Sequence, residues 1–280
     1  MLSQVSSLFF IEFGVGVLIF MLFMPLKKLK QTFFLLNGFI ALFFLICSIV
    51  LFQTFLNNVS DSEVYSKQVL YFDSYRWITV VSSLILILSY ITYVINQHLL
   101  SKVLLFFSVL FGVTAVISRG MIGVSDSLPM ISQMMGGVSF LLGALLLGGC
   151  YGTMVLGHWY LTTPDLPFKY LIGSSRFLVI TSVIRAIVLG LIMGLFFWVL
   201  GVETKKIITG IVSFNHFGLF FVMRVFWGII GPLILSFMIL ETARLRNNQA
   251  ATGILYVACV FVFIGELCAS YIFHLGGFPL

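Results

Sequence analysis

Residues 5–25 read VSSLFFIEFGVGVLIFMLFMP, and the only charged side chain among them is Glu12. A helix needs about 20 predominantly apolar residues to cross roughly 30 Å of hydrocarbon, so this stretch is long enough to span a membrane. No basic segment precedes the apolar run and no cleavage signal accompanies it. We therefore predict that it is the first transmembrane helix and not a removable signal peptide.

The composition of the whole chain leads to the same fold class. Apolar residues make up 61% of the 280 residues and charged residues 9%, whereas a soluble domain carries about 25% charged residues. These numbers exclude water-soluble, disordered, collagen-like and disulfide-scaffold proteins. Strands of a membrane barrel alternate apolar and polar residues, but here the apolar runs are continuous. The prediction is an all-α, polytopic integral membrane helical bundle.

The span criterion, applied along the chain, predicts about eight transmembrane helices and no soluble domain. Their approximate ranges are 5–25, 33–56, 75–96, 102–118, 134–160, 177–200, 216–240 and 251–274. The chain is thus a single transmembrane domain, 1–280. Prolines followed by basic residues after the first and fifth spans suggest two four-helix halves, 1–133 and 134–280. The simpler explanation is that these residues only mark cytoplasmic helix ends.

Basic residues predict the orientation in the membrane, because cytoplasmic loops carry the excess of Lys and Arg. The net charge of +6 is therefore read as topology and not as affinity for nucleic acid. The loops after the odd-numbered spans hold Lys27, Lys28, Lys30, Lys102, Lys169, Arg176, Arg244 and Arg246. The opposite side holds Lys67, Arg76, Arg119, Lys205 and Lys206. We expect the odd loops in the cytoplasm and both termini outside.

The cysteines and short motifs offer no sign of a metal centre or a hydrolytic site. The four cysteines lie singly in apolar runs, without a CxxC pair or a nearby histidine: Cys47, Cys150, Cys259 and Cys268. Iron–sulfur and zinc sites need clustered thiolates, so these residues are expected to be small apolar packing residues. Phosphate-binding, zinc-protease and serine-hydrolase motifs are also missing from any supporting context.

Charged residues inside the predicted spans are the most informative feature of the sequence. An ionised group at the centre of a span costs roughly 2.5–3.5 kcal/mol, yet Glu12, Arg185, Arg224 and Glu266 lie there. Helical rise places Glu12, Arg224 and Glu266 in the outer half of the bilayer, with Arg185 nearer the midplane. One interpretation is a polar pocket in which a carboxylate takes up a proton and an arginine orients it. The alternative is a structural ion pair that locks the bundle.

Polar neighbours of these charges would complete such a pocket. Asn215 and His216 precede the seventh span, and His274 ends the eighth. The remaining histidines, His98 and His158, fall at cytoplasmic span ends. Axial ligands of haem b in a bundle usually lie inside the spans, so a haem-bearing subunit is the weaker hypothesis and interfacial or pocket-lining histidines are the stronger one.

The segment IGELCASYIFH (264–274) resembles the last helix of the quinol-oxidising anchor subunits of dimethyl-sulfoxide-reductase and polysulfide-reductase type enzymes. In that family a Gly-Glu pair is followed by a basic residue and an aromatic pair. Gly265 and Glu266 match the pair, Ser270 stands in the basic position, and Phe273 is followed by His274. The chain length, the eight spans and an acidic residue early in the first span are also similar.

The resemblance implies two four-helix bundles and a site for menaquinone or ubiquinone near the outer face. Glu12, Glu266 and Arg224 would handle the protons and charge, and the further quinone-binding candidates are His216, His274, Asn215 and Arg185. Electrons would pass to an iron–sulfur or multihaem cytochrome subunit, in a complex of the bacterial inner membrane. Membrane lipids are the other expected partners.

Two other functions fit the same residues. In a proton-coupled carrier of a small anion, Arg185 and Arg224 would be counter-ions along a path and Glu12 and Glu266 the proton sites. Carriers often contain broken helices near the midplane, and Gly231–Pro232 in the seventh span could break one. In a structural scaffold, the charges would only bridge helices.

Overall fold

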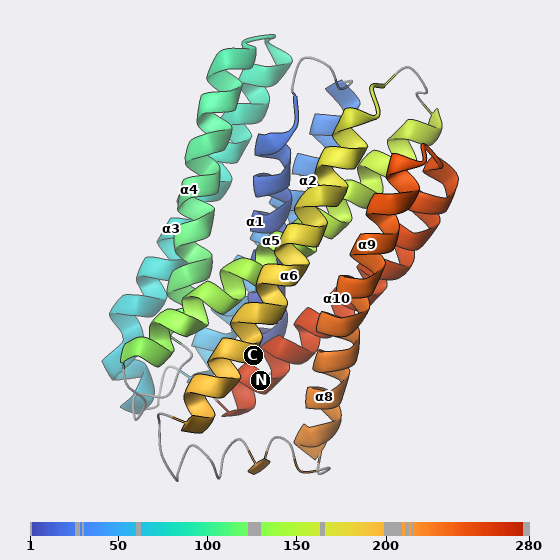
Figure 1. Cartoon of the computed structure of the whole chain (residues 1–280). Coiled ribbons are helices and arrows are strands. Elements are labelled where there is room, and N and C mark those ends of the chain that lie inside the picture. Colours follow the sequence, from blue (N-terminus) through green and yellow to red (C-terminus); the bar gives the residue numbers. More distant parts are fainter. Residues whose placement is uncertain are drawn as a thin grey trace. The chain divides into compact units, whose positions relative to one another are not determined.

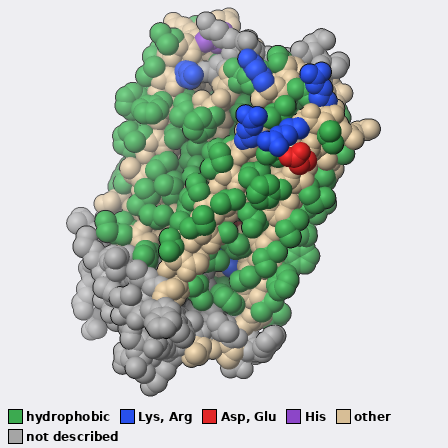
Figure 2. Space-filling model, in the orientation of Figure 1, with side chains coloured by type: hydrophobic (Ala, Val, Ile, Leu, Met, Phe, Trp, Pro, Cys, Tyr) green, Lys and Arg blue, Asp and Glu red, His purple; other side chains and the backbone are tan. Residues whose placement is uncertain are grey.

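The structure is a computed structural model in which the described residues are 2–25, 29, 31–59, 63–122, 130–162, 166–198, 209–210, 213 and 216–276. Long helices make up most of these residues, which contain no strand (Figure 1). Hydrophobic side chains are spread over the coloured part of the surface in Figure 2, and most of the Lys and Arg side chains seen there lie near the top of the view. The predicted all-α, polytopic membrane bundle is therefore confirmed, and the chain is an integral membrane protein.

Eight helices among the described residues are long and apolar enough to cross a membrane. Their elements are α1 (Leu2–Phe23), α2 (Gln31–Val59), α3 (Glu63–Val94), α4 (His98–Ile122), α5 (Met130–Thr162), α6 (Lys169–Trp198), the continuous series α8 (His216–Val225), η1 (Phe226–Ile230) and α9 (Gly231–Arg244), and α10 (Asn248–Gly276). Two helices begin well before their predicted spans: α3 begins at Glu63 and not near residue 75, and Lys169 and Arg176 lie in the first turns of α6 and not in a loop. Long basic side chains at a helix end can keep their charge at the interface, so they do not end the helix.

The seventh span changes its hydrogen-bonding pattern without breaking. Pro232 lies in the first turn of α9 and is preceded by η1, a five-residue π-helical turn. Proline has no N–H and clashes with the preceding turn, and a π turn allows the helix to continue past it. Such turns are frequent at functional sites. The expectation that Gly231–Pro232 could break a helix is therefore corrected to a π turn.

The chain divides into two compact units, residues 1–148 and 149–280, with the boundary inside α5. In unit 1, α1 packs against α2 and α4, and α3 packs against α2 and α4. A Cβ atom on Gly16 would lie 2.0 Å from the carbonyl oxygen of Ala144, so α1 crosses the first half of α5 with the two backbones in contact. Small residues allow this approach in membrane helices.

Serine hydroxyls connect neighbouring helices in unit 1. The Oγ atoms of Ser82 and Ser108 each donate to the other residue's carbonyl oxygen at 2.9 Å, which joins α3 to α4. Between α1 and α2, Ser48 Oγ donates to the carbonyl oxygen of Ser7 at 2.7 Å and lies 3.0 Å from the Tyr75 hydroxyl of α3. These polar contacts are electrically neutral.

In unit 2, α10 packs against α8, η1 and α9, and α6 packs against α9. Two glycines bring η1 and α10 together: a Cβ atom on Gly265 would lie 2.1 Å from the Cα atom of Gly228. Only residues without a side chain allow η1 and α10 to meet at this distance. The contact fixes the position of Glu266, the next residue on α10.

Candidate functional site

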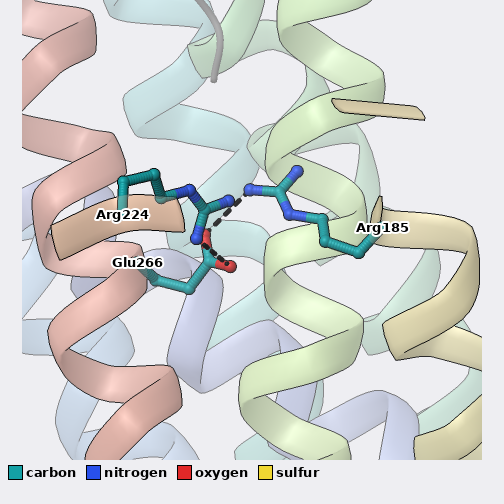
Figure 3. A network of polar contacts seen from close by, with 3 residues as sticks. All are labelled: Arg185, Arg224 and Glu266. Atoms are coloured by element: carbon teal, nitrogen blue, oxygen red, sulfur yellow. Dashed lines mark hydrogen bonds and ion pairs between the residues drawn. The ribbon is translucent and has the colours of Figure 1, made fainter. Parts of the chain in front are cut away.

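Three charged side chains from different helices meet in the interior of unit 2 (Figure 3). Arg185 of α6 donates from Nη2 to Glu266 Oε2 at 2.9 Å, and Arg224 of α8 donates from Nη1 to Glu266 Oε1 at 2.9 Å. Glu266 and Arg224 are 0% exposed and Arg185 is 1% exposed. We call these three residues the charged triad.

The local sequence explains why the triad forms. Arg224 lies one turn before Gly228, and its Nη1 atom is 2.6 Å from the place where a Gly228 Cβ would be. Gly228 thus leaves room for the guanidinium as well as for the backbone of α10. Since Gly265 contacts Gly228, the adjacent Glu266 is held where its carboxylate reaches Arg224.

The charged triad costs free energy to form inside the spans, and it also costs free energy to disrupt. Two guanidinium groups and one carboxylate lie inside spans, where ionised groups are expensive. Each carboxylate oxygen accepts a charge-assisted hydrogen bond, the stronger kind. Removing one member of a buried ion pair typically costs about 3–5 kcal/mol, because the remaining charge loses its compensation. Chemically, the arrangement can hold a proton acceptor and two hydrogen-bond donors in one place.

An apolar groove lies on another side of the same seventh span. It has a cavity volume of about 310 Å³ and is lined by Val222, Met223, Phe226, Trp227, Ile230, Gly231 and Phe261. The rings of Trp227 and Phe261 meet edge to face with centroids 4.3 Å apart. Arg224 and Gly228 are not among the lining residues, so the span presents the charged triad on one face and the groove on another.

The structure places three of the predicted site residues together. Arg185, Arg224 and Glu266 come together through the shared carboxylate, and the predicted position of Arg185 nearer the midplane stays a prediction. Glu12 is fully buried on α1, in unit 1. His274 lies on α10 two turns beyond Glu266, with its Nδ1 atom 2.8 Å from the Ser270 carbonyl oxygen.

Other predicted positions cannot be assigned to the site. Asn215 lies outside the described residues, and so does the side chain of His216, although its backbone begins α8. Among the described residues, no group of three or more His, Cys, Asp or Glu is placed to hold a metal ion.

Two features of the structure were not predicted from the sequence. Arg119, expected in a loop, lies on α4 with 2% exposure, and its guanidinium carbon is 5.3 Å from the centroid of the Phe52 ring. The mostly apolar run continues past it through Met121 and Ile122, and the polar turn residues Ser125, Asp126 and Ser127 come only later, which could have indicated a longer span. Cys150 and Cys259 do not lie singly, because their sulfur atoms are 3.4 Å apart. No sequence signal connects two cysteines separated by 109 positions.

Comparisons with known proteins add no assignment. No protein-family model and no curated protein sequence matches this chain.

Proposed function

We propose that this protein is a membrane subunit of a multi-subunit respiratory electron-transfer complex, in which the charged triad binds a quinone or quinol and exchanges protons with it. The observation that carries the proposal is the Glu266 carboxylate, buried inside unit 2 and hydrogen-bonded to Arg185 and Arg224. The resemblance of Gly265-Glu266 to the last helix of quinol-oxidising anchor subunits supports it.

The residues of the triad match the chemical needs of such a site. Oxidation of a quinol releases two electrons and two protons, so the site needs a proton acceptor within the membrane. Glu266 supplies two carboxylate oxygens for this purpose. The guanidinium groups of Arg185 and Arg224 hold the carboxylate and can donate hydrogen bonds to a quinone oxygen. Ionisable residues inside spans commonly mark proton relays.

The apolar groove supplies a place for the isoprenoid tail. Phe226 is 60% exposed and Trp227 37% exposed, so the groove opens on the surface of unit 2 and is accessible to a lipid-like molecule. Binding sites for such ligands are mostly apolar with a few placed polar groups. In this proposal the electrons continue to an iron–sulfur or multihaem cytochrome subunit, and the complex lies in a bacterial inner membrane.

Binding of short-tailed quinones tests the proposal. The purified chain in lipid nanodiscs is titrated with a short-chain ubiquinone and a short-chain menaquinone, and quenching of tryptophan fluorescence is measured. We expect saturable quenching in the wild-type chain. In Glu266→Gln the apparent Kd of the quinone should rise at least tenfold. The matched control is Glu241→Gln, which makes the same change at an exposed pair with Arg244. Quenching that does not saturate, or that is equal in both variants, would contradict the proposal.

A proton-coupled anion carrier is the second candidate, and one observation favours it: two guanidinium groups converge on a single carboxylate. If Glu266 became protonated, the two arginines could hold the carboxylate or other oxyanion group of a substrate in its place. Proteoliposomes containing a pH-sensitive dye would show proton movement when acetate, nitrate or phosphate is added outside. Anion-dependent acidification that is lost in Arg224→Gln would support the carrier over the quinone site.

A further inference from the structure

We propose that Cys150 and Cys259 are a redox-active dithiol, which closes into a disulfide between α5 and α10 by transferring two electrons to a lipid-soluble quinone. Both cysteines are free, and their sulfur atoms lie 3.4 Å apart in unit 2. A disulfide bond is about 2.05 Å long, so the sulfurs need to approach by roughly 1.4 Å. Rotation of the two side chains about their Cα–Cβ bonds is the movement that this closure requires.

The surroundings of the pair decide which class of oxidant can act on it. Cys150 is 1% exposed and Cys259 is 6% exposed, and both lie within spans. Water-soluble thiol reagents of the cell, such as glutathione, have no access to this depth. Val260, the neighbour of Cys259, is 55% exposed and lies within the same membrane-spanning helix. A redox partner must therefore arrive through the lipid, and quinones are the mobile two-electron carriers that dissolve there.

The position of Cys259 links the pair to the charged triad. Cys259 and Glu266 are seven residues apart on α10, which is close to two helical turns, so both side chains lie on the same helix face. A disulfide between Cys150 and Cys259 would tie this face to α5. The redox state of the pair would then change the freedom of the helix that carries Glu266.

The proposed step balances in atoms and electrons. Two S–H bonds break and one S–S bond forms, and the two electrons and two protons reduce the quinone to its quinol. The choice of a quinone as oxidant follows from solubility in the membrane and also agrees with the proposed function. The pairing of the sulfurs does not depend on that function.

The test uses the purified chain in nanodiscs, reduced, freed of reductant and kept without oxygen. Duroquinone is the oxidant, because its four ring methyl groups leave no position for a thiol to add. After unfolding, free thiols are counted by maleimide labelling and mass spectrometry. The chain has four cysteines, and we expect two labels to be lost together with two hydrogen atoms, with a linked peptide that contains Cys150 and Cys259.

Matched variants separate this pair from the other thiols. Cys268→Ser should still lose two labels, since Cys268 is buried on the same helix but outside the pair. Cys259→Ser should lose none. Full labelling of the wild-type chain after duroquinone, or links that involve Cys47 or Cys268 equally often, would overturn the inference. Disulfide formation without saturable tryptophan quenching would keep the inference and reject the quinone site at the triad.

Discussion

The interhelical polar contacts described in the two units of this protein differ in chemistry, although unit 1 also buries the charged side chains of Glu12 and Arg119. In unit 1 the interhelical polar contacts include reciprocal serine pairs, such as Ser82 with Ser108, and a further serine contact between Ser89 and Ser101. In unit 2 three helices meet at the charged triad. Both arrangements join apolar helices in lipid, where association relies on packing and interhelical hydrogen bonds instead of a hydrophobic driving force.

The two arrangements differ in free energy, and the difference bears on the role of the triad. Interhelical hydrogen bonds in membranes contribute on average about 0.6 kcal/mol, while each ionised group inside a span costs roughly 2.5–3.5 kcal/mol. Unit 1 shows that this chain can connect helices with inexpensive hydroxyl groups. Three charges that meet at one carboxylate are therefore more than is needed for packing, which favours a chemical role for Glu266.

The largest expected effect comes from removing the shared carboxylate. Glu266→Ala leaves Arg185 and Arg224 facing each other inside the unit, and we expect a loss of about 3–5 kcal/mol in the free energy of unfolding. Unfolding in mixed detergent micelles, titrated with sodium dodecyl sulfate, measures it. Glu241→Ala is the control, since its exposed pair with Arg244 should contribute less than about 1 kcal/mol. Equal stability of the two variants would show that the triad contributes no more than a surface ion pair.

The contact between η1 and α10 gives the next largest effect. In Gly265→Ala the new methyl group would lie 2.1 Å from the Cα atom of Gly228, so the helices must separate. Overpacking of this kind typically costs about 1–3 kcal/mol, which the same detergent titration measures. The variant should also weaken quinone binding by lengthening the Arg224–Glu266 contact.

Another glycine of the same helix provides the control. A methyl group added at Gly253 would meet no described atom within 4 Å, and Gly253→Ala should raise stability slightly because alanine favours helix. A Gly265→Ala protein with wild-type stability and quinone quenching would show that the close backbone contact does not position the triad.

The sequence predicts the helices of both units but not their polar contacts. Hydropathy locates spans because backbone hydrogen bonds must be satisfied within each segment in lipid. Each segment can therefore be recognised from its own residues alone. A charged residue inside a span can likewise be recognised as costly from its own segment, and this identifies Glu266, Arg185 and Arg224. Which of them share a carboxylate depends on helix adjacency, set here by Gly228 and Gly265, and the sequence contains no direct record of that contact.

The errors in the predicted span ends have a related physical cause. Ending spans at basic residues places Arg119 and Arg176 in loops, but both continue a helix. An arginine at a helix end can remain helical when its long side chain reaches the interface or, as at Arg119, contacts an aromatic ring. The pairing of Cys150 with Cys259 joins segments far apart in the chain, so only the tertiary structure reveals it.

The smallest effect concerns the hydroxyl contacts of unit 1. Ser48→Ala removes the bonds of its Oγ atom to the Ser7 carbonyl and the Tyr75 hydroxyl, and we expect a loss of about 0.6–1.7 kcal/mol in the free energy of unfolding with unchanged quinone quenching. Ser118→Ala is the control, because its hydroxyl bonds within α4, to the carbonyl oxygen of Ala115. A loss in Ser48→Ala as large as that in Glu266→Ala would remove the energetic contrast between the units, and with it the reason to assign chemistry to the triad.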